Sequence, residues 1–252
     1  MKIIGRKIIH FDSISSTNDV LKEKALAGER EGLVITAEEQ TKGRGRGANS
    51  WLSMRSKGLY FSVLLRPKIN TRDLGIFSLF PSIALADAIS HQSGTKASTK
   101  WPNDIFLTGK KVAGILGESS ATSQKINFVI VGAGINVLQE QKDFPPDLSD
   151  SACSIQSATG KTVEKSDLLY EILSGMESIY SQINNFADWP HLIANEWMKR
   201  CLHLERKVLV TNNTLSKEGN FSGITTAGEA LIRMENGILE KIAVGNFSLR
   251  EN

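Results

Sequence analysis

The chain has 252 residues, of which 40% are hydrophobic and 23% are charged, and its formal net charge at pH 7 is +3. This composition is typical of a soluble globular protein with one large domain, or with a domain of about 200 residues and a small appendage. The net charge is too small to indicate a polyanion partner unless basic residues gather in one place.

The N-terminus has no apolar stretch that would direct secretion, and no segment reaches the ~18 continuous apolar residues of a membrane span. Cys153 and Cys201 are far apart without metal-ligand spacing, and the four histidines form no HxxxH or HExxH pair. We therefore expect a cytoplasmic protein with two buried cysteines, no zinc site and no membrane partner.

The first part of the chain alternates short β patterns with helical ones. Strands are expected over 6–11, 32–37 and 59–65, and a helix over 17–27 follows hydroxyl and amide capping residues. A second helix is expected over 74–92, where apolar residues recur at helical spacing in spite of a proline near the first turns.

A hairpin pattern follows, because two β-rich runs at 111–116 and 127–132 are joined by a polar turn. After a loop-rich stretch over 139–160, helices are expected over 166–184 and 189–202. The fold class is therefore predicted as α+β, with a mixed and largely antiparallel sheet and with helices packed on one side of it.

The tail changes character after residue 204 and contains only short β patterns. Strands are expected over 207–210, 218–225, 230–234 and 239–244, with turns at 212–213, 227–228 and 236–237. We expect a small β-barrel of about 45 residues, too small to be stable unless it docks on the rest of the chain. The predicted domains are residues 1–203 and 204–252.

The most informative segment is GRGRGANSW at 43–51, which follows a buried strand. Glycines allow backbone N–H groups to turn toward an anion, and arginines offer planar donors that match phosphate or carboxylate. The segment matches neither GxxxxGK[ST] nor GxGxxG before an apolar helix, so the two commonest nucleotide folds lose support. A solvated basic hairpin tip and an RNA-binding element remain alternatives.

Three further segments combine with this loop. Lys100-Trp101-Pro102-Asn103-Asp104 concentrates an ammonium, an aromatic ring, an amide and a carboxylate around a rigid proline, although Asn-Asp could simply form a turn. Lys111 begins an otherwise apolar strand, where a lysine is more often an edge residue. Two glycines at 132 and 134 end a strand and indicate close approach of a ligand, or a bulge.

Together these segments resemble the biotin–protein ligase family from about residue 11 to residue 250. The resemblance rests on STN at 16–18, Gln40 with the Gly/Arg loop and its tryptophan, KWPND at 100–104, KVAGIL at 111–116 and GAGIN at 132–136. It implies a class II synthetase-like catalytic domain followed by a C-terminal barrel. The form resembled is the one without an N-terminal DNA-binding domain, since residues 1–10 leave no room for it, so no DNA partner is expected.

The resemblance implies a two-step reaction with ATP, biotin and Mg²⁺. Biotin is first activated to biotinyl-5′-AMP with release of pyrophosphate. A lysine of a biotin carboxyl carrier protein, part of acetyl-CoA carboxylase or another biotin-dependent carboxylase, then takes the biotin. A homodimer is possible through an exposed strand edge. A lipoate–protein ligase-like enzyme and a small RNA-binding module are the alternative functions.

Site residues follow from the resemblance, position by position. The residues expected to act in catalysis are Lys111, Arg46 and Asp104. Those expected to bind biotin are Ser16, Thr17, Asn18, Gln40, Gly43, Arg44, Gly45, Arg46, Trp51, Tyr60, Lys111, Gly114, Leu116, Gly132, Gly134 and Ile135. Those expected to bind ATP or the adenylate are Arg44, Arg46, Trp51, Lys100, Trp101, Asn103, Asp104, Lys111, Asn136 and Arg250.

The loop departs from the family at two positions. Similar ligases continue it as GRGRxGRxW, whereas Ala48 and Asn49 stand here in place of glycine and a third arginine. One guanidinium is therefore missing, and the strength with which ATP or the adenylate is held is open. The residues that would contact a metal are unknown from the sequence, and Mg²⁺ is expected to bind through the ATP phosphates.

Overall fold

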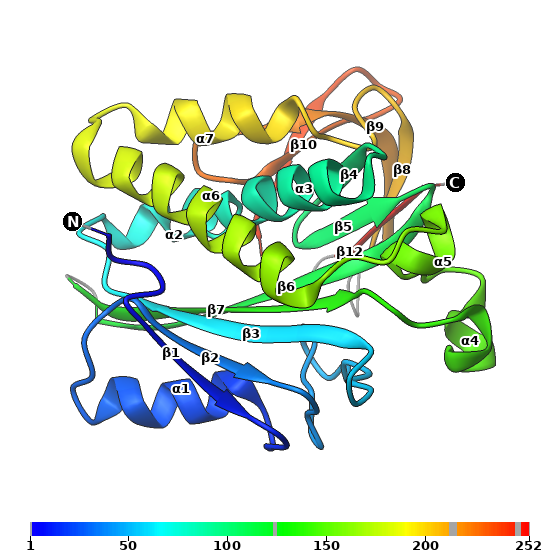
Figure 1. Ribbon diagram of the computed structural model, residues 1–252. Coiled ribbons are helices and arrows are strands. Elements are labelled where there is room, and N and C mark those ends of the chain that lie inside the picture. Colours follow the sequence, from blue (N-terminus) through cyan, green and yellow to red (C-terminus); the bar gives the residue numbers. More distant parts are fainter. Residues whose placement is uncertain (1, 123–124, 212–215, 245–247, 252) are drawn as a thin grey trace.

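The computed structural model describes residues 2–122, 125–211, 216–244 and 248–251, without the side chains of residues 248, 250 and 251 (Figure 1). The strands of these ranges form a seven-stranded sheet and a five-stranded sheet. The larger sheet carries most of the helices, and the smaller one comes from the C-terminal part of the chain. The predicted α+β class is confirmed.

The seven-stranded sheet is mixed and largely antiparallel, as predicted. Its strand order is β1-β2-β3-β7-β6-β5-β4, and only the β1–β2 pair is parallel. The strand bounds are β1 Lys7–Phe11, β2 Leu33–Ala37, β3 Gly58–Leu65, β4 Ala97–Lys100, β5 Asp104–Leu107, β6 Lys110–Ala121 and β7 Ile126–Asn136. The sequence analysis did not predict β4 and β5, which are four-residue strands on either side of the KWPND turn.

Helices cover both faces of this sheet, so the prediction of helices on one side is wrong. The helices α3 (Phe80–Ser93), α6 (Lys165–Asn185) and α7 (Trp189–Met198) lie on one face, and α1 (Thr17–Leu26) lies on the other (Figure 1). The reason is visible in β3, whose eight residues are all buried. A strand buried on both faces needs a cover on each.

The helix predicted over 74–92 is divided into α2 (Leu74–Phe77) and α3. Pro81 lies in the first turn of α3, where its missing N–H leaves no helical hydrogen bond unmade, and Gly94 ends the helix at φ 67°. The stretch Thr71–Ser93 is long and apolar enough to cross a membrane, but 67% of its most apolar window is buried inside the protein. It is therefore a core helix of the molecule, packed against α6.

The remaining helices are short, and three of them lie in the stretch that was predicted to be loop-rich. Their bounds are η1 Thr71–Asp73, η2 Gln141–Asp143, α4 Pro146–Ser149 and α5 Ile155–Thr159. This stretch crosses the end of β6, where Lys111 N donates to Ser151 O at 2.9 Å and Cys153 N donates to Lys111 O at 2.9 Å. The chain after β7 is thereby held beside Lys111.

The C-terminal sheet is an open antiparallel sheet in the described residues, not the closed barrel that was predicted. Its order is β11-β10-β9-β8-β12, so β11 and β12 are its two edges. The bounds are β8 Lys207–Thr211, β9 Ser216–Ile224, β10 Ala230–Arg233, β11 Leu239–Ile242 and β12 Ser248–Glu251. The predicted turn at 212–213 lies outside the described residues, whereas the turns at 227–228 and 236–237 join β9 to β10 and β10 to β11.

The turn at 227–228 docks this sheet on the larger one. Trp101 Nε1 donates to Gly228 O at 3.0 Å, and a Cβ at Gly228 would lie 2.6 Å from the backbone of Gly75. Backbone approaches this close are possible only without side chains. The C-terminal sheet therefore packs against the rest of the protein through this turn. The domain boundary between residues 203 and 204 stays a prediction.

Candidate active site

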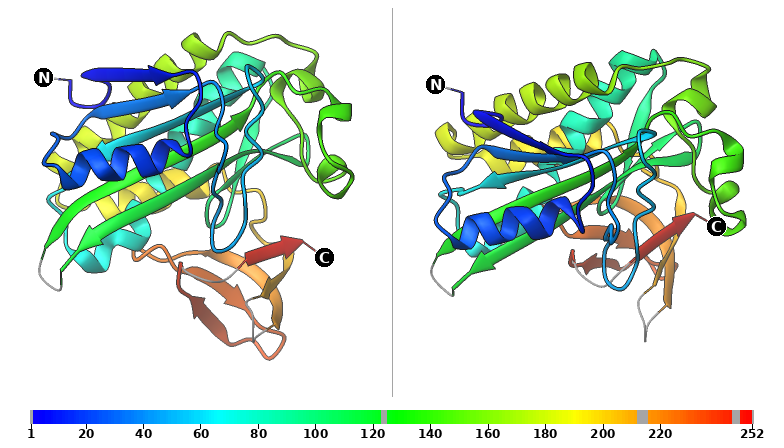
Figure 2. Two further views of the ribbon diagram at one scale, coloured as in Figure 1. Left: turned by 90° about the horizontal axis from the view of Figure 1, so that it is seen from below. Right: turned by 60° about the horizontal axis from the view of Figure 1, so that its bottom comes forward.

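A cavity of about 1230 Å³ opens on the face of the large sheet that α1 covers only in part. The long loop between β2 and β3 reaches toward the C-terminal sheet (Figure 2), and Thr211 and Leu249 of that sheet also line the cavity. The predicted site residues on the cavity wall are Ser16, Thr17, Asn18, Gln40, Arg44, Gly45, Arg46, Trp51, Lys100, Trp101, Asn103, Asp104, Lys111, Gly114, Leu116, Gly132, Gly134 and Asn136.

The floor of the cavity is made by glycines of paired strands. Gly114 and Gly134 face each other across β6 and β7. A Cβ at Gly134 would lie 2.3 Å from Trp51 Nε1, and a Cβ at Gly114 would lie 2.9 Å from Trp51 Cζ3. The indole therefore lies directly on the sheet backbone. Among the described residues, Trp51 Nε1 is a buried donor with no hydrogen-bond partner.

Alternation along β7 separates the cavity floor from the core. Residues 132 and 134 face the cavity, whereas Ile135 is fully buried in the core on the opposite face of the sheet. The predicted contact of Ile135 with biotin is therefore not supported, because adjacent residues of a strand point to opposite faces. Leu116 of β6 is on the cavity wall, as predicted.

Two other predicted residues, Tyr60 and Gly43, are not among the described residues of the cavity wall. Tyr60 is fully buried under the loop, its hydroxyl donates to Met54 O at 3.0 Å, and burial raises the pKa of its phenol. Gly43 lies at the loop base, where a Cβ would be 2.4 Å from Trp51 O. Arg250 belongs to β12, and its side chain lies outside the described part.

A β-bulge places Lys111 in the cavity. Ile105 pairs with Ala113 but Phe106 pairs with Lys111, so Val112 is an extra residue in β6. Without this bulge, Lys111 and Gly114 would point to opposite faces of the sheet, because they are three positions apart. With the bulge they share a face, and a Cβ at Gly114 would lie 3.5 Å from Lys111 Nζ.

One end of the cavity is lined by neutral polar groups that bond to one another. Gln40 Oε1 accepts from Thr17 N at 2.8 Å and from Thr17 Oγ1 at 3.1 Å, while Gln40 Nε2 donates to Ser53 Oγ at 2.9 Å. Behind the cavity wall, the fully buried Ser62 Oγ lies 2.7 Å from Thr17 Oγ1 and 2.5 Å from Asn18 Oδ1. These hydroxyls and amides are held in fixed orientations that suit an uncharged polar ligand.

The other end of the cavity carries cations around one carboxylate. Lys111 Nζ lies 2.7 Å from Asp104 Oδ1 and 5.5 Å from the centre of the Trp51 ring. Lys100 Nζ lies 4.7 Å from the centre of the Phe106 ring. Asn103 Nδ2 donates to Ile115 O at 2.8 Å, which ties the KWPND turn to β6. This end suits a ligand with several negative charges.

The two arginines of the loop point to these two ends. Arg44 Nη2 lies 2.8 Å from Asp19 Oδ1 and 2.6 Å from Glu118 Oε2, beside the neutral polar end. Arg46 Nη1 lies 3.4 Å from Asn103 Oδ1, at the cationic end. Burial lowers the pKa of the Arg46 guanidinium, and the nearby charge of Asp104 opposes that shift.

The loop itself is a small hairpin. Arg44 and Ser50 form an antiparallel bridge, and Gly45 N donates to Asn49 O at 2.8 Å. Asn49, which the sequence analysis placed at the position of a third arginine, donates from Nδ2 to Arg46 O at 3.0 Å. The turn contains Gly47 at φ 66°, a conformation that side chains disfavour. Asn49 thus stabilises the turn that presents Arg46.

Two predicted ATP-binding residues have their polar groups engaged within the protein. Asn136 Nδ2 donates to Cys153 O at 3.1 Å, and Asn136 Oδ1 accepts from Gln139 Nε2 at 3.1 Å. Trp101 is 1% exposed, and its indole N–H bonds to Gly228 O, as described above. Both residues line the cavity, so any contact they make with a nucleotide would use ring or amide faces.

Sequence reasoning missed one wall of the cavity and one charged residue. The missed wall consists of Phe144, Asp147, Leu148, Ser151 and Ala152. Glu118, which pairs with Arg44, was also not singled out. The proline pair at 145–146, where α4 begins, gives no ligand signal, but a serine at position 62 in an otherwise apolar buried strand is a signal that could have been used. In the described ranges, no three His, Cys, Asp or Glu residues gather as a metal site.

A family model described as the biotin/lipoate A/B protein ligase family matches residues 10–136. This range contains the STN segment, the Gly/Arg loop, KWPND, Lys111 and the glycines of β7. The chain belongs to this family. The same range contains the end of β1, all of β2 to β7 and most of the cavity wall, so the match and the geometry concern the same part of the molecule.

Relatives extend this family likeness over nearly the whole chain. The bifunctional ligase/repressor BirA of Bacillus subtilis is 32% identical over 237 residues, which are 94% of this chain and 72% of that protein. A biotin–[acetyl-CoA-carboxylase] ligase of Paracoccus denitrificans is 30% identical over 208 residues, 79% of this chain and 83% of that one. The biotin protein ligase of Aquifex aeolicus, solved in complex with biotin and ATP, superposes with a TM-score of 0.85 at 31% identity and covers 98% of this chain and 100% of that one.

Proposed function

We propose that this chain is an ATP-dependent biotin–protein ligase that forms biotinyl-5′-AMP and transfers biotin to a lysine of a biotin carboxyl carrier protein. The observation that carries the proposal is the division of one cavity into a neutral polar end and a cationic end. A fused ureido ring needs hydrogen-bond partners without charge, and a triphosphate needs cations. The cavity offers both, on either side of a glycine floor covered by Trp51.

In the first step a biotin carboxylate oxygen attacks the α-phosphorus of ATP, and the bond to the pyrophosphate oxygen breaks. Two anions must approach each other, so their repulsion has to be screened. Lys111 would supply that screening, because the bulge in β6 places its ammonium between Trp51 and Asp104. Arg46 would bind the phosphates or the finished adenylate from the loop side.

In the second step the neutral ε-amine of the carrier lysine attacks the carbonyl carbon of the mixed anhydride. The bond from that carbon to the phosphate oxygen breaks, AMP leaves, and the amine nitrogen loses a proton. Asp104 is the carboxylate nearest to Lys111, so it would orient that ammonium and the incoming amine. The role of Asp104 follows from geometry and charge alone.

Magnesium would enter with the triphosphate and neutralise part of its charge. The described residues have no cluster of carboxylates or histidines that would hold the ion without the nucleotide. This arrangement fits a hard cation that keeps water and phosphate oxygens as its main ligands. A cytoplasmic location, the absence of DNA and membrane partners, and a homodimer stay predictions from the sequence.

The second candidate is a lipoate–protein ligase, because the family model covers both substrates. The neutral polar end argues against it. Gln40, Thr17 and Asn18 present polar groups on the cavity wall, and a dithiolane offers no hydrogen-bond partner for their remaining donors and acceptors. A ureido ring can bond to them with both its carbonyl and its N–H groups.

The test is native mass spectrometry of the purified chain after incubation with Mg²⁺-ATP and either biotin or lipoate. We expect protein-bound biotinyl-adenylate with biotin and little or no adduct with lipoate. An adduct with lipoate alone would establish the second candidate. No adduct with either acid, in a sample that remains folded, would reject the ligase proposal.

A further inference from the structure

We propose that Glu118 and Arg44 form a latch that holds the Gly/Arg loop against the neutral polar end of the cavity, and that Glu118 is a positioning residue for the acid substrate and not for the nucleotide. The inference rests on the proposed function for the identity of that acid, biotin. The latch itself is visible without any ligand, so it can be tested apart from the function.

Glu118 joins two groups that come from distant parts of the chain. Its Oε2 accepts from Arg44 Nη2 at 2.6 Å and from Asn18 Nδ2 at 2.7 Å. Glu118 extends from β6, Arg44 from the loop and Asn18 from α1, so one carboxylate oxygen connects three elements. Both bonds are charge-assisted, and such bonds are shorter and stronger than bonds between neutral groups.

Through its bond to Asn18, Glu118 also affects the orientation of an amide on the cavity wall. With its Nδ2 bonded to Glu118, the Asn18 amide turns its oxygen toward Ser62 Oγ, 2.5 Å away. The Asn18 amide lies against the backbone of Gly132 in β7, since a Cβ at that glycine would lie 2.1 Å from Asn18 Oδ1. The orientation of the amide group is set by its hydrogen bonds, which include a second, longer one from Nδ2 to Leu116 O at 3.4 Å. Losing Glu118 would remove the shorter of the two bonds that Nδ2 donates, and would weaken the preference for the orientation in which the amide oxygen faces Ser62.

The contact to Arg44 acts on the loop backbone. Glycines at 43, 45 and 47 make the loop entropically costly to order. The turn is held by Asn49 on the Arg46 side, and Arg44 is the residue that ties the other strand of the hairpin to the body of the protein through Glu118 and Asp19. The two arginines therefore have different roles. Arg44 anchors the loop to the body of the protein, and Arg46 points to the cationic end of the cavity.

This division predicts a selective kinetic effect. Glu118→Ala should raise the Kd and KM for biotin roughly tenfold, because a charge-assisted contact is lost and the amide of Asn18 is less restrained. The KM for ATP should stay within about twofold, because the phosphates are bound at the other end of the cavity. Arg44→Ala should behave like Glu118→Ala, and the double variant should be no more than about twofold worse than either, as expected for one shared interaction.

The matched control is Glu240→Ala. Glu240 pairs with Lys217 in the C-terminal sheet at 2.5 Å, with side-chain exposures of 32% and 33%, close to the 23% and 39% of Glu118 and Arg44. This variant removes an ion pair of similar exposure from another part of the molecule. We expect it to leave biotin binding and loop exchange unchanged.

The deciding measurement is hydrogen–deuterium exchange of the unliganded protein, together with biotin titration. Glu118→Ala should speed exchange in peptides covering 43–52 by about threefold or more, and leave the C-terminal sheet at the wild-type rate. Unchanged exchange in the loop would overturn the latch, as would an equal rise in the KM for biotin and ATP. If the wild-type chain binds no biotin, the function fails, while the exchange result still decides whether the latch exists.

Discussion

The two ends of the cavity differ in charge, because one presents neutral polar groups and the other presents cations. At the neutral end, hydroxyls and amides of Thr17, Asn18, Gln40 and Ser62 bond to each other, and the charged residues nearby are paired with each other. At the cationic end, lysine and arginine surround Asp104. A ligand at the first end is recognised by hydrogen-bond geometry, and a ligand at the second by charge. This difference explains how one cavity can join an uncharged ring system to a triphosphate.

The loop shows that closeness in sequence is a poor guide to shared function. Arg44 and Arg46 are two positions apart, in a repeat that makes them look equivalent. The hairpin sends one to a pair of carboxylates and the other toward the KWPND turn. Variants that act on only one end of the cavity are therefore the way to test the comparison.

The largest effect is expected from Lys111→Ala at the cationic end. Removing the ammonium that screens the two anions should lower kcat for adenylate formation by about a hundred- to a thousandfold, while biotin alone still binds. Pyrophosphate release under saturating substrates is the measurement. Lys110→Ala is the control, because Lys110 Nζ bonds to Ser149 O and does not line the cavity. Near-normal pyrophosphate release by Lys111→Ala would remove this lysine from the mechanism.

The glycine floor between the two ends gives the next prediction. In Gly134→Ala the new Cβ would lie 2.3 Å from Trp51 Nε1, so the indole must move off the sheet. Overpacking of this kind should weaken binding of both substrates by about ten- to a hundredfold. Gly117→Ala is the matched control in β6, since a Cβ there meets nothing within 4 Å. Trp51 fluorescence and two separate KM values would report the change, and equal behaviour of the two variants would contradict the proposed floor.

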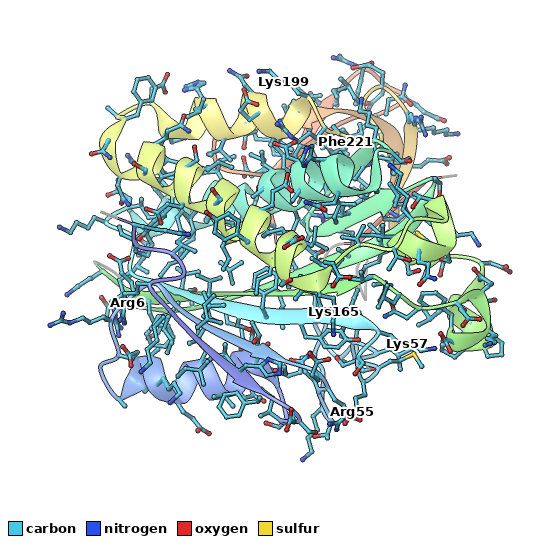
Figure 3. All side chains as sticks on the ribbon, in the orientation of Figure 1. Arg6, Arg55, Lys57, Lys165, Lys199 and Phe221 are labelled. Carbon is cyan, nitrogen blue, oxygen red and sulfur yellow. The ribbon has the colours of Figure 1, made fainter. Side chains whose placement is uncertain are left out.

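The pH dependence of the free energy of unfolding tests a buried titratable group that does not line the cavity. His203 is fully buried, and its ring centre lies 4.3 Å from that of Phe221, which is labelled in Figure 3. Burial lowers the pKa of the His203 imidazole to about 3, and Lys100 and Arg206 act in the same direction. In the unfolded chain the imidazole binds a proton near pH 6.5. The contribution of His203 to the free energy of unfolding is therefore fully present above that pH and is lost as the pH falls. The loss should approach about 1.4 kcal/mol per pH unit between pH 6 and pH 3.

The measurement for His203 is urea unfolding at pH 7 and pH 5 with wild type and His203→Phe. Wild type should lose roughly 2 kcal/mol between these values from this residue, and the variant should lose less by that amount. An identical pH dependence of both proteins would show that His203 does not titrate in this way. In that case a loss of activity at low pH would have to be assigned to the cavity.

The smallest effect is expected from Trp101→Phe, at the junction of the two sheets. The variant keeps an aromatic ring but loses the bond to Gly228 O, which should lower the unfolding free energy by about 1 kcal/mol. The KM for ATP should stay within about twofold if Trp101 mainly docks the C-terminal sheet. A raised KM for ATP at unchanged stability would instead support the contact with adenine predicted from the sequence.

Much of the fold could be predicted from the pattern of residues. The bounds of β1, β2, α1 and α6 agree with the expected segments to within a residue or two, because buried strands and capped helices leave local signals. The four-residue strands β4 and β5 were missed because, unlike the equally short β10 and β11, they have no Asn-Gly turn between them to indicate a hairpin. The closed barrel was an inference from strand spacing, and pairing between the first and last strands is a property of the assembled sheet that spacing does not carry.

The chemical groups of the site could be identified from residue order, since the Gly/Arg loop, KWPND and the strand glycines are local motifs. Tertiary structure decided which of these groups share a surface. The bulge at Val112 turns Lys111 into the cavity, alternation turns Ile135 out of it, and Glu118 becomes relevant only because β6 passes beside the loop. Motifs identify residue types. The face of the sheet on which a side chain lies depends on strand register and on contacts between segments far apart in the chain.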